Sequence, residues 1–74
     1  MTEGVTEIKI TTDSIALDQF LKWAQVVPSG GMAKQLIQAG EVLVNGECET
    51  KRSRRLTIGD EVEVRGLGRF RLGK

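Results

Sequence analysis

The sequence contains no histidine and no tyrosine, and it has only one cysteine, Cys48, and one proline. Without histidine, a chain cannot build a Cys/His zinc site, a Ser-His-Asp triad or a Cys-His nucleophile pair. A lone cysteine cannot form a disulfide within the chain. These absences exclude most familiar hydrolytic chemistry, so we expect a protein that is not an enzyme and that needs no metal ion or cofactor.

Long apolar segments are also absent. No segment approaches the roughly 20 apolar residues that cross a bilayer, and residues 1–4 lack the basic and apolar regions of a signal peptide. We therefore expect a cytoplasmic protein with no membrane partner. The 74 residues, 39% of them hydrophobic, suffice for one small core but not for a large catalytic cleft. We expect one domain over residues 1–74 and no small-molecule substrate.

The net charge of +1 conceals a segregation of charge along the chain. Residues 1–49 carry three basic and seven acidic side chains, whereas residues 50–74 carry eight basic and three acidic ones, which gives balances of −4 and +5. Because local potential rather than net charge steers binding, this segregation indicates a polyanionic partner. A solvated loop that keeps a small protein soluble is the alternative.

The first third of the chain predicts a strand and a helix. Residues 7–11 alternate polar and apolar side chains, as in a half-buried strand whose Ile8 and Ile10 face the core. Residues 15–24 have apolar side chains at helical spacing, and residues 12–14 offer oxygens that would cap this helix. The stripe that should face the core consists of Leu17, Phe20, Leu21 and Ala24.

A second helix and a hairpin are predicted next. Pro28 ends the first helical segment, Ser29 is a good N-cap, and Gly40 is a typical C-terminal stop. The apolar residues 42–44 then predict a strand. Asn45-Gly46 favours a type I′ hairpin turn, because both central positions of that turn need a positive φ. The return strand is expected over 47–50.

The last third of the chain predicts a basic loop and two strand segments. Residues 51–55 are polar and strongly basic, and Gly59-Asp60 predicts a turn into a half-buried strand over 61–65. Glycines at 66 and 68 predict a bend. Residues 69–72 alternate again, so they either continue the strand past the bend or pair with the N-terminal strand.

The order and spacing of four segments closely resemble the S-four RNA-binding domain, a family named after the fourth protein of the small ribosomal subunit. These segments are LDQFLK at 17–22, SGGMAKQLI at 29–37, GEVLVNG at 40–46 and GDEV at 59–62. The resemblance covers about residues 8–65 and is closest to small stand-alone bacterial members, which carry no catalytic domain. It implies a compact α+β fold, the alpha-L RNA-binding motif, in which two short helices pack on a small, mostly antiparallel sheet.

The resemblance also implies an RNA-binding face formed by the two helices and the following hairpin region, where basic and polar side chains meet phosphates of structured RNA. On this sequence the face comprises Lys22, Ser29, Lys34, Gln35, Lys51, Arg52, Arg54 and Arg55. Many family members have an arginine or another polar residue where this chain has Gly30 and Gly31, so a positive contact is lost there. Independently of the family, four cations within residues 51–55 form a compact patch suited to phosphate, since arginine forks bind phosphate in a bidentate manner.

Aromatic residues are scarce, and they indicate which kind of RNA is favoured. The chain has only Phe20, Trp23 and Phe70. Because this is no stacking platform of the type that binds single strands, recognition of a folded RNA by shape and backbone is favoured. Both phenylalanines are expected to be structural. Trp23 flanks the apolar stripe, which favours partial burial over base stacking.

The remaining polar candidates favour structure over chemistry. Glu47 and Glu49 lie two residues apart on one strand face, but a hairpin edge open to water should leave both pKa values near normal. Gly59-Asp60 is expected to be a turn rather than a metal site, because the nearby carboxylates do not converge. Cys48 is expected to be a packing or surface residue.

We therefore expect non-catalytic binding of structured RNA, namely ribosomal RNA or a ribosomal assembly particle, with ribosomal proteins as a further class of partner. The choice of RNA over DNA and of the ribosome as target rests on the resemblance, because electrostatics supports any polyanion. The alternative is a protein-interaction module, a ribosome-associated factor whose basic loop only aids solubility. Whether Arg69, Arg71 and Lys74 extend the RNA-binding face is left open by the sequence.

Overall fold

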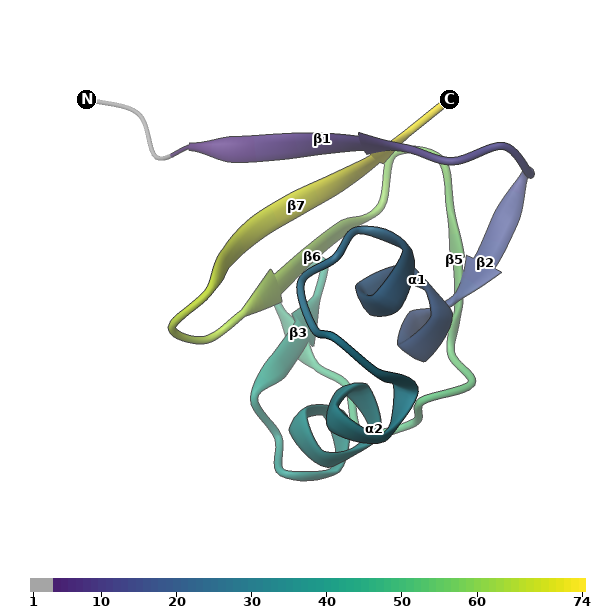
Figure 1. The fold of residues 1–74 in the computed structure, drawn as a ribbon. Coiled ribbons are helices and arrows are strands. Elements are labelled where there is room, and N and C mark those ends of the chain that lie inside the picture. Colours follow the sequence, from purple (N-terminus) through teal and green to yellow (C-terminus); the bar gives the residue numbers. More distant parts are fainter. Residues whose placement is uncertain (1–3) are drawn as a thin grey trace.

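The computed structural model describes residues 4–74; residues 1–3, part of the N-terminus in which we expect no signal peptide, lie outside the described residues. The chain forms the expected compact α+β fold, with two helices on one face of a sheet and a small strand pair beside α1 (Figure 1). The elements are β1 (Val5–Lys9), β2 (Ser14–Ala16), α1 (Leu17–Trp23), α2 (Gly30–Gln38), β3 (Val42–Val44), β4 (Glu47–Cys48), β5 (Arg55–Thr57), β6 (Glu61–Val64) and β7 (Gly68–Gly73). Within residues 4–74, neither helix is long and apolar enough to span a bilayer.

The larger sheet is mixed but mostly antiparallel. Its strand order is β1-β7-β6-β3-β4, and only the pairing of β1 with β7 is parallel. Strand β7 continues from β6 past the glycine bend and also pairs with the N-terminal strand, so both roles considered for residues 69–72 are realised together. Strand β1 begins and ends two residues earlier than expected, because the chain leaves the sheet after the Ile10 amide binds the carbonyl of Gly73 at 2.8 Å.

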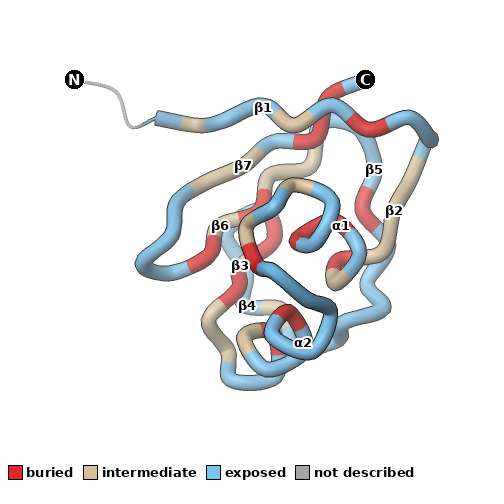
Figure 2. Tube along the Cα trace, viewed as in Figure 1, coloured by how far each residue is buried: buried red, intermediate tan, exposed pale blue. Residues whose placement is uncertain are grey.

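One apolar core lies between the helices and the strands, where buried residues from all layers meet (Figure 2). The expected helical stripe is confirmed, because Leu17, Phe20 and Leu21 are fully buried. Strands β3 and β6 contribute alternate valines, as their sequence pattern predicts. The core consists of Ile10, Leu17, Phe20, Leu21, Val27, Ala33, Ile37, Val42, Val44, Leu56, Val62, Val64 and Leu72, with Ile8 and Phe70 packed against it.

The first helix starts later than expected and is not capped by a side chain. Its N-cap is Ala16, and the prediction that residues 12–14 supply capping oxygens is wrong. Residues 14–16 instead form β2, in which Ile15 pairs with Leu56 of β5. This strand pairing takes the place of the first helical turn, because it buries Leu56 and partly buries Ile15.

The hairpin and the turn before β6 form a single hydrogen-bonded unit. Asn45 and Gly46 have φ values of 52° and 87°, which confirms the expected turn. The Asn45 amide group donates to the Asp60 carboxylate at 3.2 Å and accepts the Glu61 amide at 3.0 Å. Asp60 also accepts the Thr57 amide at 2.9 Å. Asp60 therefore joins two turns, and within residues 4–74 no group of three or more acidic or cysteine side chains could hold a metal ion.

Candidate nucleic-acid interface

The basic loop, residues 51–55, is anchored to the start of α1 through its backbone. The amide of Leu17 donates to the carbonyl of Arg54 at 2.8 Å, and the amide of Asp18 donates to the carbonyl of Arg52 at 3.1 Å. Because the first amides of a helix have no partner within the helix, the loop acts as the cap that a side chain provides elsewhere. The loop backbone is thereby fixed beside α1, while all five side chains of residues 51–55 stay exposed.

Glu49 fixes the same loop from its other end. Its carboxylate accepts the Arg54 guanidinium at 2.7 Å and the Lys51 amide at 3.1 Å, and its side chain is only 17% exposed. The hydrogen bond from Arg54, followed by that from the Lys51 amide, lowers the pKa of Glu49 below its ordinary value. The expectation of a normal pKa at Glu49 is therefore wrong, because Arg54 folds back over the carboxylate.

The four cations of the basic loop consequently differ in what they can bind. Arg54 is paired with Glu49, so its charge is already balanced, although its side chain is 41% exposed. Within residues 4–74, Lys51, Arg52 and Arg55 form no ion pair. These three side chains are therefore the ones available to an anionic partner.

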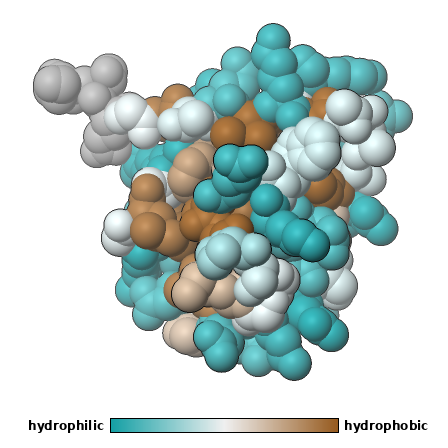
Figure 3. Space-filling view, viewed as in Figure 1, coloured by the Kyte–Doolittle hydropathy of each residue, from teal (hydrophilic) through white to brown (hydrophobic). Residues whose placement is uncertain are grey.

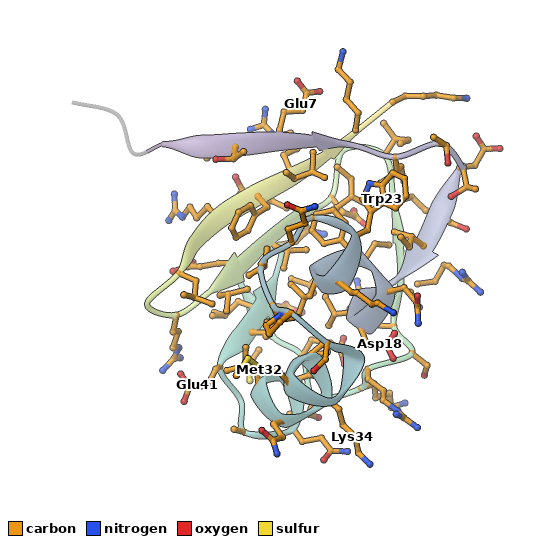
Figure 4. All side chains as sticks on the ribbon, viewed as in Figure 1. Glu7, Asp18, Trp23, Met32, Lys34 and Glu41 are labelled. Atoms are coloured by element: carbon orange, nitrogen blue, oxygen red, sulfur yellow. The ribbon has the colours of Figure 1, made fainter. Side chains whose placement is uncertain are left out.

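The helices add exposed polar side chains to the candidate interface. Lys22 on α1 and both Lys34 and Gln35 on α2 are exposed, and Lys34 points away from α2 into solvent (Figure 4). Ser29 is also exposed, and its hydroxyl accepts the Met32 amide at 3.2 Å, which confirms its role as the helix cap. All eight residues expected at the site thus lie on the surface, and Ser29 and Arg54 among them already have structural hydrogen bonds.

The basic tail differs from the basic loop because its cations face carboxylates. Arg69 lies 3.7 Å from Glu63, and Arg71 lies 4.0 Å from Glu61, across the β6–β7 pair. The third tail cation, Lys74, lies 3.2 Å from the carboxylate of Asp13. Each such exposed pair adds at most about 1 kcal/mol of stability, yet it balances the local charge. We therefore leave the tail out of the candidate interface.

Trp23 lies next to this interface at the end of α1. The residue is 50% exposed, and its indole N–H donates to the carbonyl of Lys9 at 2.9 Å. The expected partial burial is therefore confirmed. Sequence reasoning missed the fixed orientation of the ring, because the donor and acceptor are separated by 14 residues and belong to different elements.

Comparison with known proteins adds two findings to this geometry. A family model described as S4 domain matches residues 8–71 of the chain. A protein of Bacillus subtilis (strain 168), named "Probable ribosome maturation protein RlbA", is 51% identical over 65 residues, which cover 88% of this chain and 92% of that protein. The family match includes both helices, the hairpin and the basic loop.

Proposed function

Because this chain belongs to the S4 domain family, we propose that it binds structured RNA, namely ribosomal RNA or a ribosomal assembly particle, without catalysing a reaction. The resemblance seen in its motifs is confirmed by the family match. The proposal rests on the basic loop, whose backbone caps α1 and whose Lys51, Arg52 and Arg55 side chains are exposed and without an ion pair within residues 4–74. The name of the Bacillus relative supports a link to the ribosome.

The fixed backbone of the basic loop favours binding of a folded RNA. Two hydrogen bonds to α1 and two to Glu49 hold the loop before any partner arrives. Ordering a loop on binding costs free energy, so a loop that is already ordered retains more of its interaction energy as affinity. Contacts to phosphates supply affinity and position rather than base specificity. We expect specificity to come from the shape of the RNA, which must match the loop and both helices.

The carboxylate nearest to the cations is poorly suited to general acid catalysis. A general acid at neutral pH needs a raised pKa, whereas the hydrogen bond from Arg54 lowers the pKa of Glu49. Glu49 therefore favours its ionised form, in which it accepts the hydrogen bonds from Arg54 and the Lys51 amide. This supports a binding role for the surface rather than an acid–base reaction.

A salt titration with two matched variants tests the proposal. The test variant replaces Lys51, Arg52 and Arg55 with alanine, and the control replaces the paired tail cations Arg69 and Arg71 with alanine. Binding of a fluorescent ribosomal RNA fragment is measured by anisotropy at several salt concentrations. We expect the test variant to bind at least about tenfold more weakly and to flatten the log–log salt slope by about 2 to 3, at 0.7 to 0.9 per lost phosphate contact.

The control variant should change affinity by less than about twofold, because Arg69 and Arg71 face carboxylates of β6. Equal losses in both variants would mean that overall charge matters and the loop does not. Wild-type affinity in the test variant would refute the loop as the RNA site. Binding of the test variant to ribosomal particles, with no binding of the wild type to RNA alone, would favour the protein-interaction alternative.

A further inference from the structure

Two adjoining hollows open beside Trp23, with volumes of about 490 and 320 Å³. They share Ile15, Gln19 and Trp23 in their walls. Lys22 and Gln25 complete the first hollow, and Arg55 lies in the wall of the second. We call the two together the Trp23 groove. It adjoins the proposed RNA interface, because Lys22 and Arg55 belong to both.

The indole ring of Trp23 is held in place although the residue is half exposed. Its N–H is bound to the carbonyl of Lys9 at 2.9 Å, and Figure 4 shows the ring between α1, β1 and β2. A fixed ring loses little conformational freedom when a second flat group stacks on it. Because Trp23 lines both hollows, part of its surface is accessible to a second flat group.

The charges around the Trp23 groove select the kind of group that fits. Its walls contain the cations Lys22 and Arg55, and no carboxylate of the described residues 4–74 lines them. Gln19 adds an amide that can donate to and accept from the edge of a flat polar ring. An occupant with a flat face and a negative charge complements this set, and an unpaired nucleotide has both features.

We propose that the Trp23 groove receives one unpaired nucleotide of the bound RNA, whose base stacks on Trp23 while its phosphate lies near Lys22 or Arg55. This inference rests on the proposed function, since the nucleotide belongs to an RNA already held by the basic loop. Figure 3 shows that hydrophobic residues form patches among hydrophilic residues on this face of the molecule. Within residues 4–74 Trp23 is the one exposed aromatic residue, because Phe20 is buried and Phe70 packs against the core. One stacking position is therefore the most that this surface offers, which suits a bulged nucleotide in a folded RNA.

The protein itself provides the spectroscopic probe, because Trp23 is its only tryptophan and it has no tyrosine. The test uses two fluorescently labelled RNA hairpins that differ only by one bulged adenosine in the stem. Anisotropy gives the affinity, and tryptophan emission reports stacking at Trp23. We expect the bulged hairpin to bind at least about fivefold more tightly, because stacking of a base on an aromatic side chain typically has an effect of this size or larger. Only the bulged hairpin should quench the emission.

Two substitutions separate stacking from a structural role of Trp23. Trp23→Leu should abolish the preference for the bulged hairpin and leave the affinity for the plain hairpin unchanged. Trp23→Phe loses the hydrogen bond to Lys9 but keeps a flat ring, so it should retain most of the preference. Thermal unfolding followed by circular dichroism checks that both variants fold. Loss of the preference in both folded variants would show that the indole N–H, and not the ring face, matters, and retention of the preference in both would show that neither matters. Either result would overturn the proposal.

Failure of this inference can be distinguished from failure of the proposed function. Equal binding of both hairpins by the wild type, with unchanged emission, would overturn the nucleotide site and leave the RNA-binding function intact. Absence of binding to either hairpin and to the ribosomal RNA fragment would overturn both. Loss of affinity for both hairpins in a folded Trp23→Leu protein would place Trp23 in the general interface and would also contradict a dedicated nucleotide site.

Discussion

Gln25 adopts a backbone conformation that favours glycine. It follows the end of α1 with φ of 60°, and the next amide, that of Val26, reaches back to the carbonyl of Leu21 at 3.0 Å. A left-handed conformation costs an L-residue about 1 to 2 kcal/mol. We expect Gln25→Gly to raise the free energy of unfolding by about 0.5 to 1 kcal/mol. This gain is smaller than the relieved strain, because glycine has more conformational freedom than glutamine in the unfolded chain. Urea denaturation with an unchanged m-value measures this gain.

The matched control for Gln25→Gly lies at the end of α2. Gly40 occupies the equivalent position with φ of 80°, and a Cβ there would lie 3.7 Å from the Cys48 sulfur, which is an ordinary contact. Gly40→Ala should therefore lower the free energy of unfolding by about 1 to 2 kcal/mol through backbone strain alone. A Gln25→Gly protein no more stable than the wild type would show that contacts of the glutamine side chain offset its strain.

Residues whose role depends on local chemistry could be predicted, and those that depend on distant partners could not. Ser29, Gly40 and the Asn45-Gly46 turn follow from cap and turn preferences that act within a few residues. No local signal marks Gln25 as left-handed. The bond between Asn45 and Asp60 joins residues 15 apart, and only the pairing of β3 with β6 brings them together.

At the scale of elements, Glu49 holds the basic loop, and the backbone of this loop caps α1. The pKa of this carboxyl is lowered from an ordinary value of 4.5, so the ionised form is favoured in the folded state. Such a group adds stability above its unfolded-state pKa, and the contribution is lost as the pH falls through the folded-state pKa. The bond between Glu49 and Arg54 should therefore stabilise the protein at neutral pH and not in strong acid.

Glu49→Gln tests this dependence. At pH 7 we expect the variant to be less stable by roughly 0.5 to 1 kcal/mol, a value reduced for the partial exposure of the Arg54 side chain. The difference from the wild type should stay constant from pH 7 down to about the ordinary pKa of 4.5 and shrink as the pH falls further, because the wild-type carboxyl then becomes neutral as well. Urea denaturation at several pH values gives both quantities.

Glu47→Gln is the control, because Glu47 is an exposed residue of β4 with no ion pair within residues 4–74. Its effect should be small, within about 0.5 kcal/mol, at pH 7. If Glu49→Gln is as stable as Glu47→Gln at pH 7, the contact with Arg54 does not hold the loop. A stability deficit of Glu49→Gln that persists unchanged at low pH would point to packing rather than charge.

The boundaries of elements are harder to predict from the sequence than their buried faces. The apolar stripe of α1 is visible at helical spacing, and it identifies the buried face correctly. The start of α1 is not visible in the sequence, because Ile15 is used by the β2–β5 pair and the cap comes from carbonyls more than 30 residues away at Arg52 and Arg54. Non-local backbone bonds therefore decided the boundary.

At the scale of the whole molecule, folding redistributes the charge that the sequence segregates. Seven of the eight basic residues after position 49 lie either in the tail, where Arg69 and Arg71 face carboxylates, or in the basic loop, where Arg54 alone forms an ion pair within residues 4–74. The register of β6 against β7 sets Glu63 opposite Arg69 and Glu61 opposite Arg71. Charge counting along the chain could not reveal this division, because it depends on the register of the sheet.

The salt dependence of RNA binding should follow the local cations rather than the net charge of +1. Five exposed cations of the proposed face form no ion pair within residues 4–74, and they are Lys22, Lys34, Lys51, Arg52 and Arg55. At 0.7 to 0.9 per contact, they predict a wild-type log–log slope of about −3.5 to −4.5.

Gly30, exposed at the start of α2, has open space around a Cβ. Gly30→Arg should therefore steepen the slope by about 0.7 to 0.9 and tighten binding.

Gly4→Arg is the control for Gly30→Arg, because it adds the same charge at another open position, next to β1. Anisotropy titrations at several salt concentrations compare both variants with the wild type. If Gly4→Arg steepens the slope as much as Gly30→Arg, the interaction responds to net charge, and the face formed by the helix pair and the basic loop has no special role. If only Gly30→Arg does so, the start of α2 lies against phosphates, because a contact that releases counterions must be close to the RNA backbone.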